Sequence, residues 1–339
     1  MADKELARVR LKRKGDEACR KMIDHLQQRD PNLYKELGLT STQPAPPVPA
    51  QDPVECSATL IPTTEAFWRA KENDKSIYPV TKNNIRSRVA LLITNIKFTN
   101  EELNRSGAEK DEVNTEKLLT ALGYEVVKHT NLTAEDIDKA LVDFSKHPKL
   151  KETDSVVVVI MSHGKLGLVL GVNWQQGGEK PDEFPVNNIY KHLGSQECPA
   201  LLNKPKIIII QACRGDEKGY VLISSDSAVV CDEVPKPGPT APAGVDNLDE
   251  DSLQCVHKEK DFIAFLSCTP DTVSYRRRDH GSFLIQFIVE VFNTFAHKDD
   301  IDELFRKVMQ RFEDFSLRKQ MPTKDRCTLP KRFYFFPGL

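Results

Sequence analysis

Residues 207–215 read Ile207-Ile208-Ile209-Ile210-Gln211-Ala212-Cys213-Arg214-Gly215. Four consecutive isoleucines are typical of a strand that is buried on both faces, as strands are inside a parallel sheet. The apolar run stops at a thiol, so Cys213 is expected at the carboxyl end of a core strand. Because ligands of open α/β sheets bind outside those ends, the stretch predicts a functional site at Cys213.

A second stretch has the same form. Residues 156–161 are an unbroken apolar run that ends in Ser162-His163-Gly164, about fifty positions before Cys213. The two runs place a His and a Cys at the tips of two predicted core strands. Gln-Ala-Cys-Arg-Gly with a His about fifty residues upstream is itself a recognised local signature of one family of cysteine proteases.

These residue types suit attack on a peptide carbonyl. A free Cys is only a few per cent thiolate at neutral pH, and an imidazole can take its proton and later protonate the leaving amine. Backbone N–H groups near Gly164 and Cys213 are candidate donors to the oxyanion, and one such donor is worth on the order of 10²–10³ in rate. Alone, a Cys after four Ile is usually a small core residue and a single His is usually structural. The pair predicts that His163, Gly164 and Cys213 are catalytic.

Composition limits the class of protein. The chain has 339 residues, 39% of them hydrophobic, which is enough for one sizeable α/β domain with extensions. The net charge of −2 with dispersed lysines and arginines does not indicate nucleic acid or a membrane surface. No apolar run approaches ~20 residues and the amino terminus has no apolar signal region, so a cytoplasmic protein is expected. Eight scattered cysteines without C-x-x-C pairs indicate reduced thiols and no metal site, and no cofactor is expected.

Strands alternate with helical patterns from about Ile77 onward, which predicts an α/β fold with a doubly wound, mostly parallel sheet flanked by helices on both faces. Residues 1–40 hold at most two amphipathic helices, and residues 41–76 are a Pro-rich linker. Residues 217–260 break the pattern with a Pro-rich and then acidic loop, which at this length is usually either functional or disordered. The chain is expected to end in an aromatic strand at residues 333–336.

By these motifs the chain resembles the caspases over roughly residues 77–339. Four segments are similar to the inflammatory, interleukin-converting branch, namely residues 104–109, 261–265, 269–276 and 333–338. The resemblance implies a caspase-like sheet sandwich, an endopeptidase that cuts protein substrates after aspartate, and a homodimer of large/small subunit pairs. It also implies a role in cytokine maturation and pyroptotic cell death.

The resemblance assigns a substrate pocket to Arg105, Gln211 and Arg276. An arginine holds a carboxylate out of water with fixed, permanently charged donors, which agrees with this assignment. Val273 and Tyr275 belong to the same substrate-binding surface, and Tyr275 stands where this branch often has Trp, beside the subsite for the fourth residue before the cut. The neighbouring Arg277 and Arg278 are either an exposed basic rim or an attraction for acidic substrate residues.

The resemblance also divides the chain. Residues 1–40 are similar to the end of a caspase recruitment domain, a six-helix bundle of which about the last two helices are expected here. Two helices do not bury a core of their own, so an inflammasome adaptor is a partner only if this segment is functional. The expected parts are a recruitment remnant, a linker and prodomain junction, a large subunit, a processing linker and a small subunit, at residues 1–40, 41–76, 77–226, 227–251 and 252–339.

Two processing sites are predicted in the long loop, at Asp226 before Ser227 and at Asp251 before Ser252, because proteolysis concentrates in exposed segments. The alternative to an active protease is a non-catalytic caspase-like decoy that pairs with an active caspase. Intact Cys213 and His163 speak against the decoy.

Overall fold

The computed structural model describes residue 29 and residues 57–215, 257–313 and 320–339. All of these except residue 29 belong to one compact unit, Cys56–Leu339. Apart from residue 29, the segment 1–40 with its predicted helices lies outside the described residues, as do the predicted processing sites Asp226 and Asp251.

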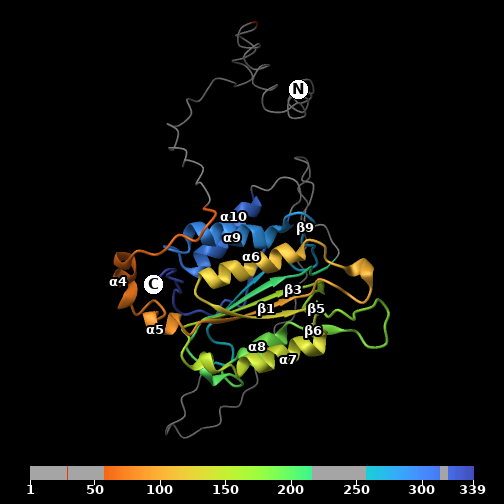
Figure 1. Ribbon diagram of the computed structural model, residues 1–339, viewed down its shortest axis with the longest axis horizontal. Helices are drawn as coiled ribbons and strands as arrows, with labels where there is room; N and C mark the ends of the chain where they lie inside the picture. Colours follow the sequence, from red (N-terminus) through yellow and green to blue (C-terminus); the bar gives the residue numbers. More distant parts are fainter. Residues whose placement is uncertain (1–28, 30–56, 216–256, 314–319) are drawn as a thin grey trace, which may run out of the picture. The chain divides into compact units, whose positions relative to one another are not determined.

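A six-stranded sheet forms the centre of this unit, in the order β11-β8-β7-β3-β1-β2 (Figure 1). Every neighbouring pair is parallel except β11 with β8. The strands are β1 Val89–Thr94, β2 Glu125–Thr130, β3 Val156–Met161, β7 Lys206–Gln211, β8 Phe262–Leu266 and β11 Thr323–Asp325. The predicted α/β class with a mostly parallel sheet is confirmed.

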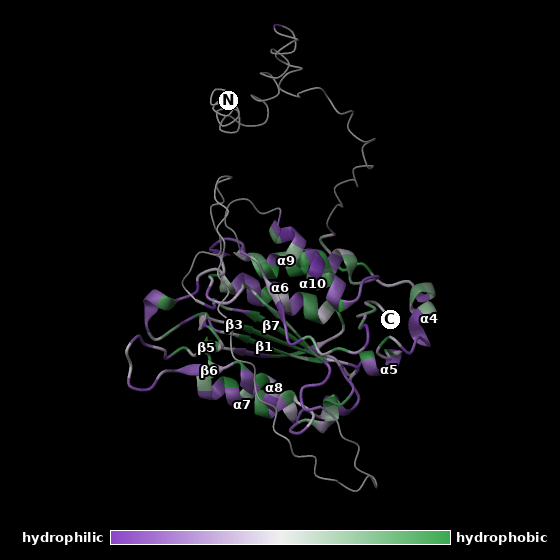
Figure 2. Cartoon of the chain, turned by 180° about the vertical axis from the view of Figure 1, so that it is seen from behind, coloured by the Kyte–Doolittle hydropathy of each residue, from purple (hydrophilic) through white to green (hydrophobic). Residues whose placement is uncertain are grey.

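Helices cover both faces of the sheet (Figure 1). One face carries α6, α9 and α10, and the other carries α7 and α8; their bounds are α6 Ala108–Ala121, α7 Ala134–Ser145, α8 Asn187–Leu193, α9 Phe283–Phe295 and α10 Ile301–Glu313. Ile207 and Ile209 join the apolar cluster on the α6 and α9 side, and Ile208 and Ile210 join the opposite cluster. The isoleucine run is continuous because both of its faces are buried, and Figure 2 shows the central strands in the hydrophobic colour.

Shorter elements surround the sheet. A three-stranded sheet and a two-stranded hairpin lie beside it, and within residues 57–88 two helices precede it. Their bounds are α4 Glu65–Glu72, α5 Lys82–Ile85, β4 Gly164–Lys165, β5 Leu168–Leu170, β6 Glu183–Pro185, β9 Arg276–Arg277 and β10 Gly281–Ser282, with single 3₁₀ turns η1 Glu101–Leu103, η2 Pro148–Lys151 and η3 Pro199–Leu201. No helix in the described parts of the chain is long and apolar enough to cross a bilayer.

The prediction of an aromatic strand at residues 333–336 was wrong. This segment is buried against α9 but is not part of a sheet, and Phe336 has a φ of 45° that breaks an extended backbone. The backbone groups bond elsewhere: the Phe333 carbonyl accepts from the N–H of Ile301, and the Phe335 carbonyl accepts from the Arg88 side chain. The aromatic residues fill the core without pairing as a strand.

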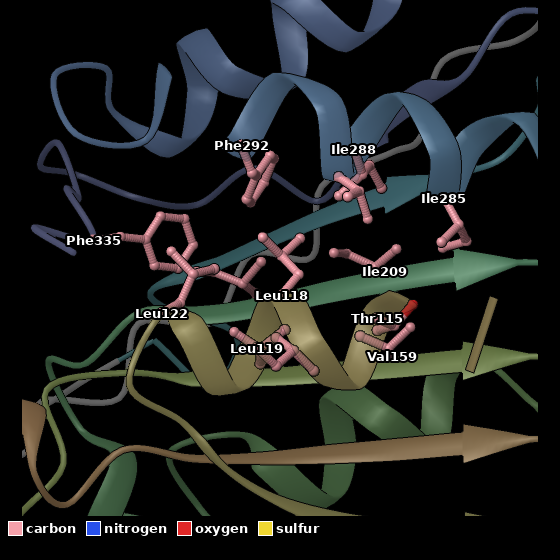
Figure 3. A pocket seen from close by; sticks show the side chains of 13 residues that line it. Thr115, Leu118, Leu119, Leu122, Val159, Ile209, Ile285, Ile288, Phe292 and Phe335 are labelled. Atoms are coloured by element: carbon pink, nitrogen blue, oxygen red, sulfur yellow. The ribbon is translucent and has the colours of Figure 1, made fainter. Parts of the chain in front are cut away.

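A small cavity of about 20 Å³ lies between α6, α9 and the sheet (Figure 3). Its walls are almost entirely aliphatic and aromatic, and Leu118, Ile288 and Phe335 are among them. The one polar side chain in the wall is Thr115, whose buried hydroxyl hydrogen-bonds to nothing in the described residues.

Candidate active site

The carboxyl ends of β3 and β7 bring the predicted catalytic residues to one edge of the sheet. These strands are neighbours, with Met161 opposite Gln211, so His163 and Cys213 each follow the last paired residue by two positions. Gly164 packs directly against this end of β7, because a Cβ added there would lie 2.8 Å from the Cys213 carbonyl oxygen. The structure therefore brings these three residues together, as the strand pattern predicted.

The imidazole of His163 is held by a backbone group. Its Nε2 lies 2.8 Å from the carbonyl oxygen of Leu103, the last residue of η1, and the Phe98 ring packs on it at 5.1 Å between centroids. A carbonyl oxygen only accepts, so Nε2 carries the hydrogen and Nδ1 is the basic atom when the ring is neutral. Burial lowers the pKa of His163 to about 4, with the charges of Arg105 and Arg276 in the same direction and the Leu103 bond opposing.

The thiol of Cys213 is partly buried and close to a second backbone segment. Its Sγ lies 3.8 Å from the carbonyl oxygen of Ser274 and 3.7 Å from the Ser274 Oγ. The thiol also lines a cavity of about 190 Å³ together with Arg214. The four cysteines in the described residues, at positions 198, 213, 268 and 327, are free thiols.

Arg105 is buried beside this pair with most of its donors unused. It is 1% exposed, and its Nη1 donates to the Asn95 carbonyl at 2.7 Å. Its Nε and Nη2 have no hydrogen-bond partner in the part of the chain described. Burial, reinforced by the charge of Arg276, lowers the pKa of Arg105 to about 9. A buried guanidinium with two unpartnered nitrogens can bind an anion such as a carboxylate.

Gln211 and Arg276 complete the predicted pocket. The Gln211 Nε2 donates to the Ser274 Oγ at 3.0 Å, while its buried Oε1 has no partner among the described atoms. The Arg276 Nε donates to the Ser106 carbonyl at 3.0 Å, which places this arginine against the loop that carries Arg105. Burial lowers the pKa of Arg276. The two arginines and the glutamine thus come from three separate segments and meet beside Cys213.

Val273 and Tyr275, the remaining residues of the predicted substrate-binding surface, lie in the loop of residues 268–275, which leads into Arg276. Val273 and Tyr275 are both partly buried, and Tyr275 packs against the α9 side of the core. The Tyr275 N–H donates to the Gln320 Oε1 at 2.9 Å, which fixes the loop. Arg277 and Arg278 are exposed, and the Arg277 guanidinium sits 5.5 Å from the centroid of the Phe283 ring.

Sequence reasoning missed three residues of this site. The Leu103 carbonyl carries no side-chain signal, and Ser274 is an ordinary serine until the fold places it beside Cys213. Asp111 is buried near both pocket arginines. Its signal in the sequence is an acid on the first turn of a helix, which usually indicates only helix stabilisation.

Comparison with known proteins agrees with the geometry. A family model described as Caspase domain matches residues 87–334. The chain is 45% identical over 307 residues to Caspase a of Danio rerio, covering 88% of this chain and 76% of that protein. It is 36% identical over 349 residues to Caspase-1 of Felis catus, covering 96% and 85%. The fold is shared with the crystal structure of Caspase-1 from Spodoptera frugiperda, at a TM-score of 0.61 and 21% identity over 82% of this chain and 97% of that one. The chain therefore belongs to the caspase family of aspartate-specific cysteine peptidases, and within it to the inflammatory branch.

Proposed function

We propose that Cys213 is the nucleophile and His163 the general base of an endopeptidase that cuts proteins after aspartate. The observation that carries the proposal is the buried Arg105 guanidinium with two unpartnered nitrogens beside the Cys213 thiol. Buried hydrogen-bond donors without an acceptor cost free energy, and a substrate carboxylate would accept from both of these nitrogens. The pocket thus favours an acidic residue at the position directly before the cut bond.

The chemistry follows from the arrangement of the two residues. The Sγ of Cys213 attacks the scissile carbonyl carbon as its proton passes to His163 Nδ1, which is unprotonated in the resting site. Backbone N–H groups of Gly164 and Cys213 are proposed to hold the oxyanion. The tetrahedral species collapses, the C–N bond breaks, and the His163 proton goes to the leaving amine. Water then hydrolyses the thioester, with the same imidazole as base, and the thiol is restored.

Aspartate selectivity is assigned to the pocket of Arg105, Gln211 and Arg276. Two guanidinium groups anchor a short carboxylate at a fixed distance from Cys213. Glutamate has one more methylene, so binding its carboxylate displaces the scissile carbonyl. Asparagine leaves the charged donors unpaired, and mismatches of this kind cost about 10⁴ in rate.

The test is cleavage of matched fluorogenic tetrapeptides with Asp, Asn or Glu before the cut. Asp should be strongly preferred in kcat/KM, and Cys213→Ala and His163→Ala should abolish cleavage. Cys327→Ala is the matched control, because this thiol is exposed and should not affect cleavage. Equal rates on the three peptides would reject the pocket, and activity in the Cys213→Ala protein would reject the nucleophile and favour the decoy alternative.

The biological role proposed is that of an inflammatory caspase acting in the cytoplasm, in cytokine maturation and pyroptotic cell death. Likeness to Caspase-1 along most of the chain supports it, and family membership supports protein substrates and a dimer of large/small subunit pairs. The subunits are assigned to residues 77–226 and 252–339. An inflammasome adaptor is a proposed partner through residues 1–40.

A further inference from the structure

A buried carboxylate joins the pocket region of α6 to the segment that precedes α9. Asp111, in the first turn of α6, is 1% exposed and accepts two hydrogen bonds from Ser282. Its Oδ1 accepts from the Ser282 N–H at 2.7 Å, and its Oδ2 accepts from the Ser282 hydroxyl at 2.6 Å. Both carboxylate oxygens are thus used by a single residue that lies 171 positions later in the chain.

Ser282 is the strand partner of one pocket arginine. In the β9–β10 hairpin it lies opposite Arg276, with Gly281 opposite Arg277. The other pocket arginine, Arg105, lies just before the start of α6. Asp111 therefore links, through α6 on one side and Ser282 on the other, the two segments that carry the pocket guanidinium groups.

Two glycines show how closely these segments approach. Gly281 has a φ of +88°, and a Cβ added to it would lie 2.3 Å from the Asp111 Oδ1. Gly107 has a φ of +91°, and a Cβ there would lie 2.4 Å from the Arg277 carbonyl oxygen. Both positions combine a left-handed backbone with a contact that no side chain fits. The hairpin is therefore fixed against the start of α6 with little freedom to shift.

Charge gives Asp111 a second connection to the pocket. Its carboxylate attracts both Arg105 and Arg276, whose guanidinium groups repel each other. Burial raises the pKa of Asp111, while the two Ser282 bonds and both arginines lower it. An anion at this place offsets part of the cost of holding two partly desolvated cations near each other.

We propose that Asp111 is a positioning residue for the aspartate pocket, and that through Ser282 it sets the separation of Arg276 from Arg105 that a substrate carboxylate requires. The proposal rests on the proposed function of that pocket. Asp111 does not touch the reacting atoms; it acts through the hairpin. If the chain is cut between residues 227 and 251, Asp111 and Ser282 lie on different pieces. The two hydrogen bonds between them then hold the two halves of the pocket together across the cut.

The test compares Ser282→Ala and Asp111→Asn with wild-type protein on tetrapeptides that differ only in Asp or Glu before the cut. Ser282→Ala removes one hydrogen bond to a charged group, so kcat/KM on the Asp peptide should fall about tenfold. The loss should appear mainly in KM, and the preference for Asp over Glu should fall with it. Glu116→Gln is the control, because Glu116 is on the same helix but pairs with Lys128 at the surface.

A second measurement separates positioning from general damage. Iodoacetamide alkylates a thiol without using the pocket, so its rate with Cys213 should be unchanged in Ser282→Ala. If Ser282→Ala lowers kcat/KM equally on both peptides, the preference for Asp over Glu is unchanged. That result, with or without a lower melting temperature, would mean that Asp111 has only a structural role, and it would overturn the proposal. A wild-type chain that cleaves neither peptide would overturn the pocket assignment itself. If Asp111→Asn does not fold, Ser282→Ala alone decides.

Discussion

The Nε2 atom of His163 lies 2.8 Å from the carbonyl oxygen of Leu103, and this one bond orients the imidazole at the carboxyl end of β3. The carbonyl can only accept, so it selects the tautomer that leaves Nδ1 free to take a proton. The ring is buried against Phe98, and this burial is the main reason that its pKa falls to about 4. His163 is therefore kept neutral in the folded protein.

The first prediction is that His163 makes the protein less stable in mild acid. The folded pKa of about 4 lies below the unfolded value, so the unfolded chain binds more protons between about pH 6.5 and pH 4. The contribution of neutral His163 to the free energy of unfolding is fully present above that range, and it is lost as the pH falls through it. Between pH 7 and pH 5 this one group should lower the free energy of unfolding by about 2 kcal/mol.

Urea unfolding of the Cys213→Ala protein, which is expected to be inactive, at the two pH values measures this loss. When His163→Asn is added, the drop in the free energy of unfolding from pH 7 to pH 5 should be smaller by about 2 kcal/mol. His257→Asn, at an exposed histidine, is the matched control for the substitution itself. An identical pH dependence with and without His163 would contradict the prediction.

The second prediction contrasts two arginines that are equally buried, at 1% exposure each. The Arg88 side chain donates to both Asp154 oxygens and to the carbonyls of Leu122 and Phe335. Arg88→Met would leave the buried Asp154 carboxylate without its ion-pair partner, with only the Ser155 hydroxyl still donating to it, and should cost about 3–5 kcal/mol. Arg105→Met removes a mostly unpaired cation at the loss of one bond to Asn95, so its stability should be unchanged or raised by up to about 2 kcal/mol.

Activity should change in the opposite sense in Arg105→Met. Cleavage after Asp should fall by about 10³ or more, because the pocket loses its buried donor to the carboxylate. Unfolding curves and peptide kinetics on the same preparations give both quantities. A strong destabilisation by Arg105→Met would show that this guanidinium stabilises the fold, and that its donors are not free for a substrate carboxylate.

A third prediction concerns the cavity between α6 and α9. Thr115→Val replaces the unpartnered hydroxyl in its wall by a methyl group of similar shape, and should stabilise the protein by about 1 kcal/mol. Thr120→Val, at an exposed position of the same helix, is the control and should lie within about 0.5 kcal/mol of wild type. Thermal unfolding of the two variants decides the matter. A destabilised Thr115→Val protein would mean that the hydroxyl has a partner such as a buried water.

The fourth prediction is self-processing at Asp226 and Asp251, each followed by a serine. Intact mass spectrometry of purified active protein should find a large piece ending at Asp226 and a small piece starting at Ser252. The pieces should remain associated, because β8 pairs with β7 in one sheet. Asp226→Ala and Asp251→Ala should each suppress one cut, and full activity from a single unclipped chain would refute the maturation scheme.

The sequence by itself determined the sheet and the place of the site. Two apolar runs that end in His163 and Cys213 predict parallel core strands, and parallel strands present their carboxyl ends at the same edge. The two residues come together there because the structure places β3 next to β7. The resemblance to a known family named Arg105 and Arg276. The structure brings both to that edge, and it also shows two unpartnered nitrogens on Arg105.

Only the tertiary structure decided which backbone groups and distant side chains complete the arrangement. The carbonyl of Leu103 belongs to the main chain, which every residue has, so no residue type announces its bond to His163. Asp111 and Ser282 are 171 positions apart, and their pairing depends on how α6 meets the β9–β10 hairpin. The aromatic residues 333–336 look like a strand because strand and core share the same composition. Their conformation depends on the donors that bind their carbonyls, the Ile301 N–H and the Arg88 side chain, and these are brought there only by the tertiary fold.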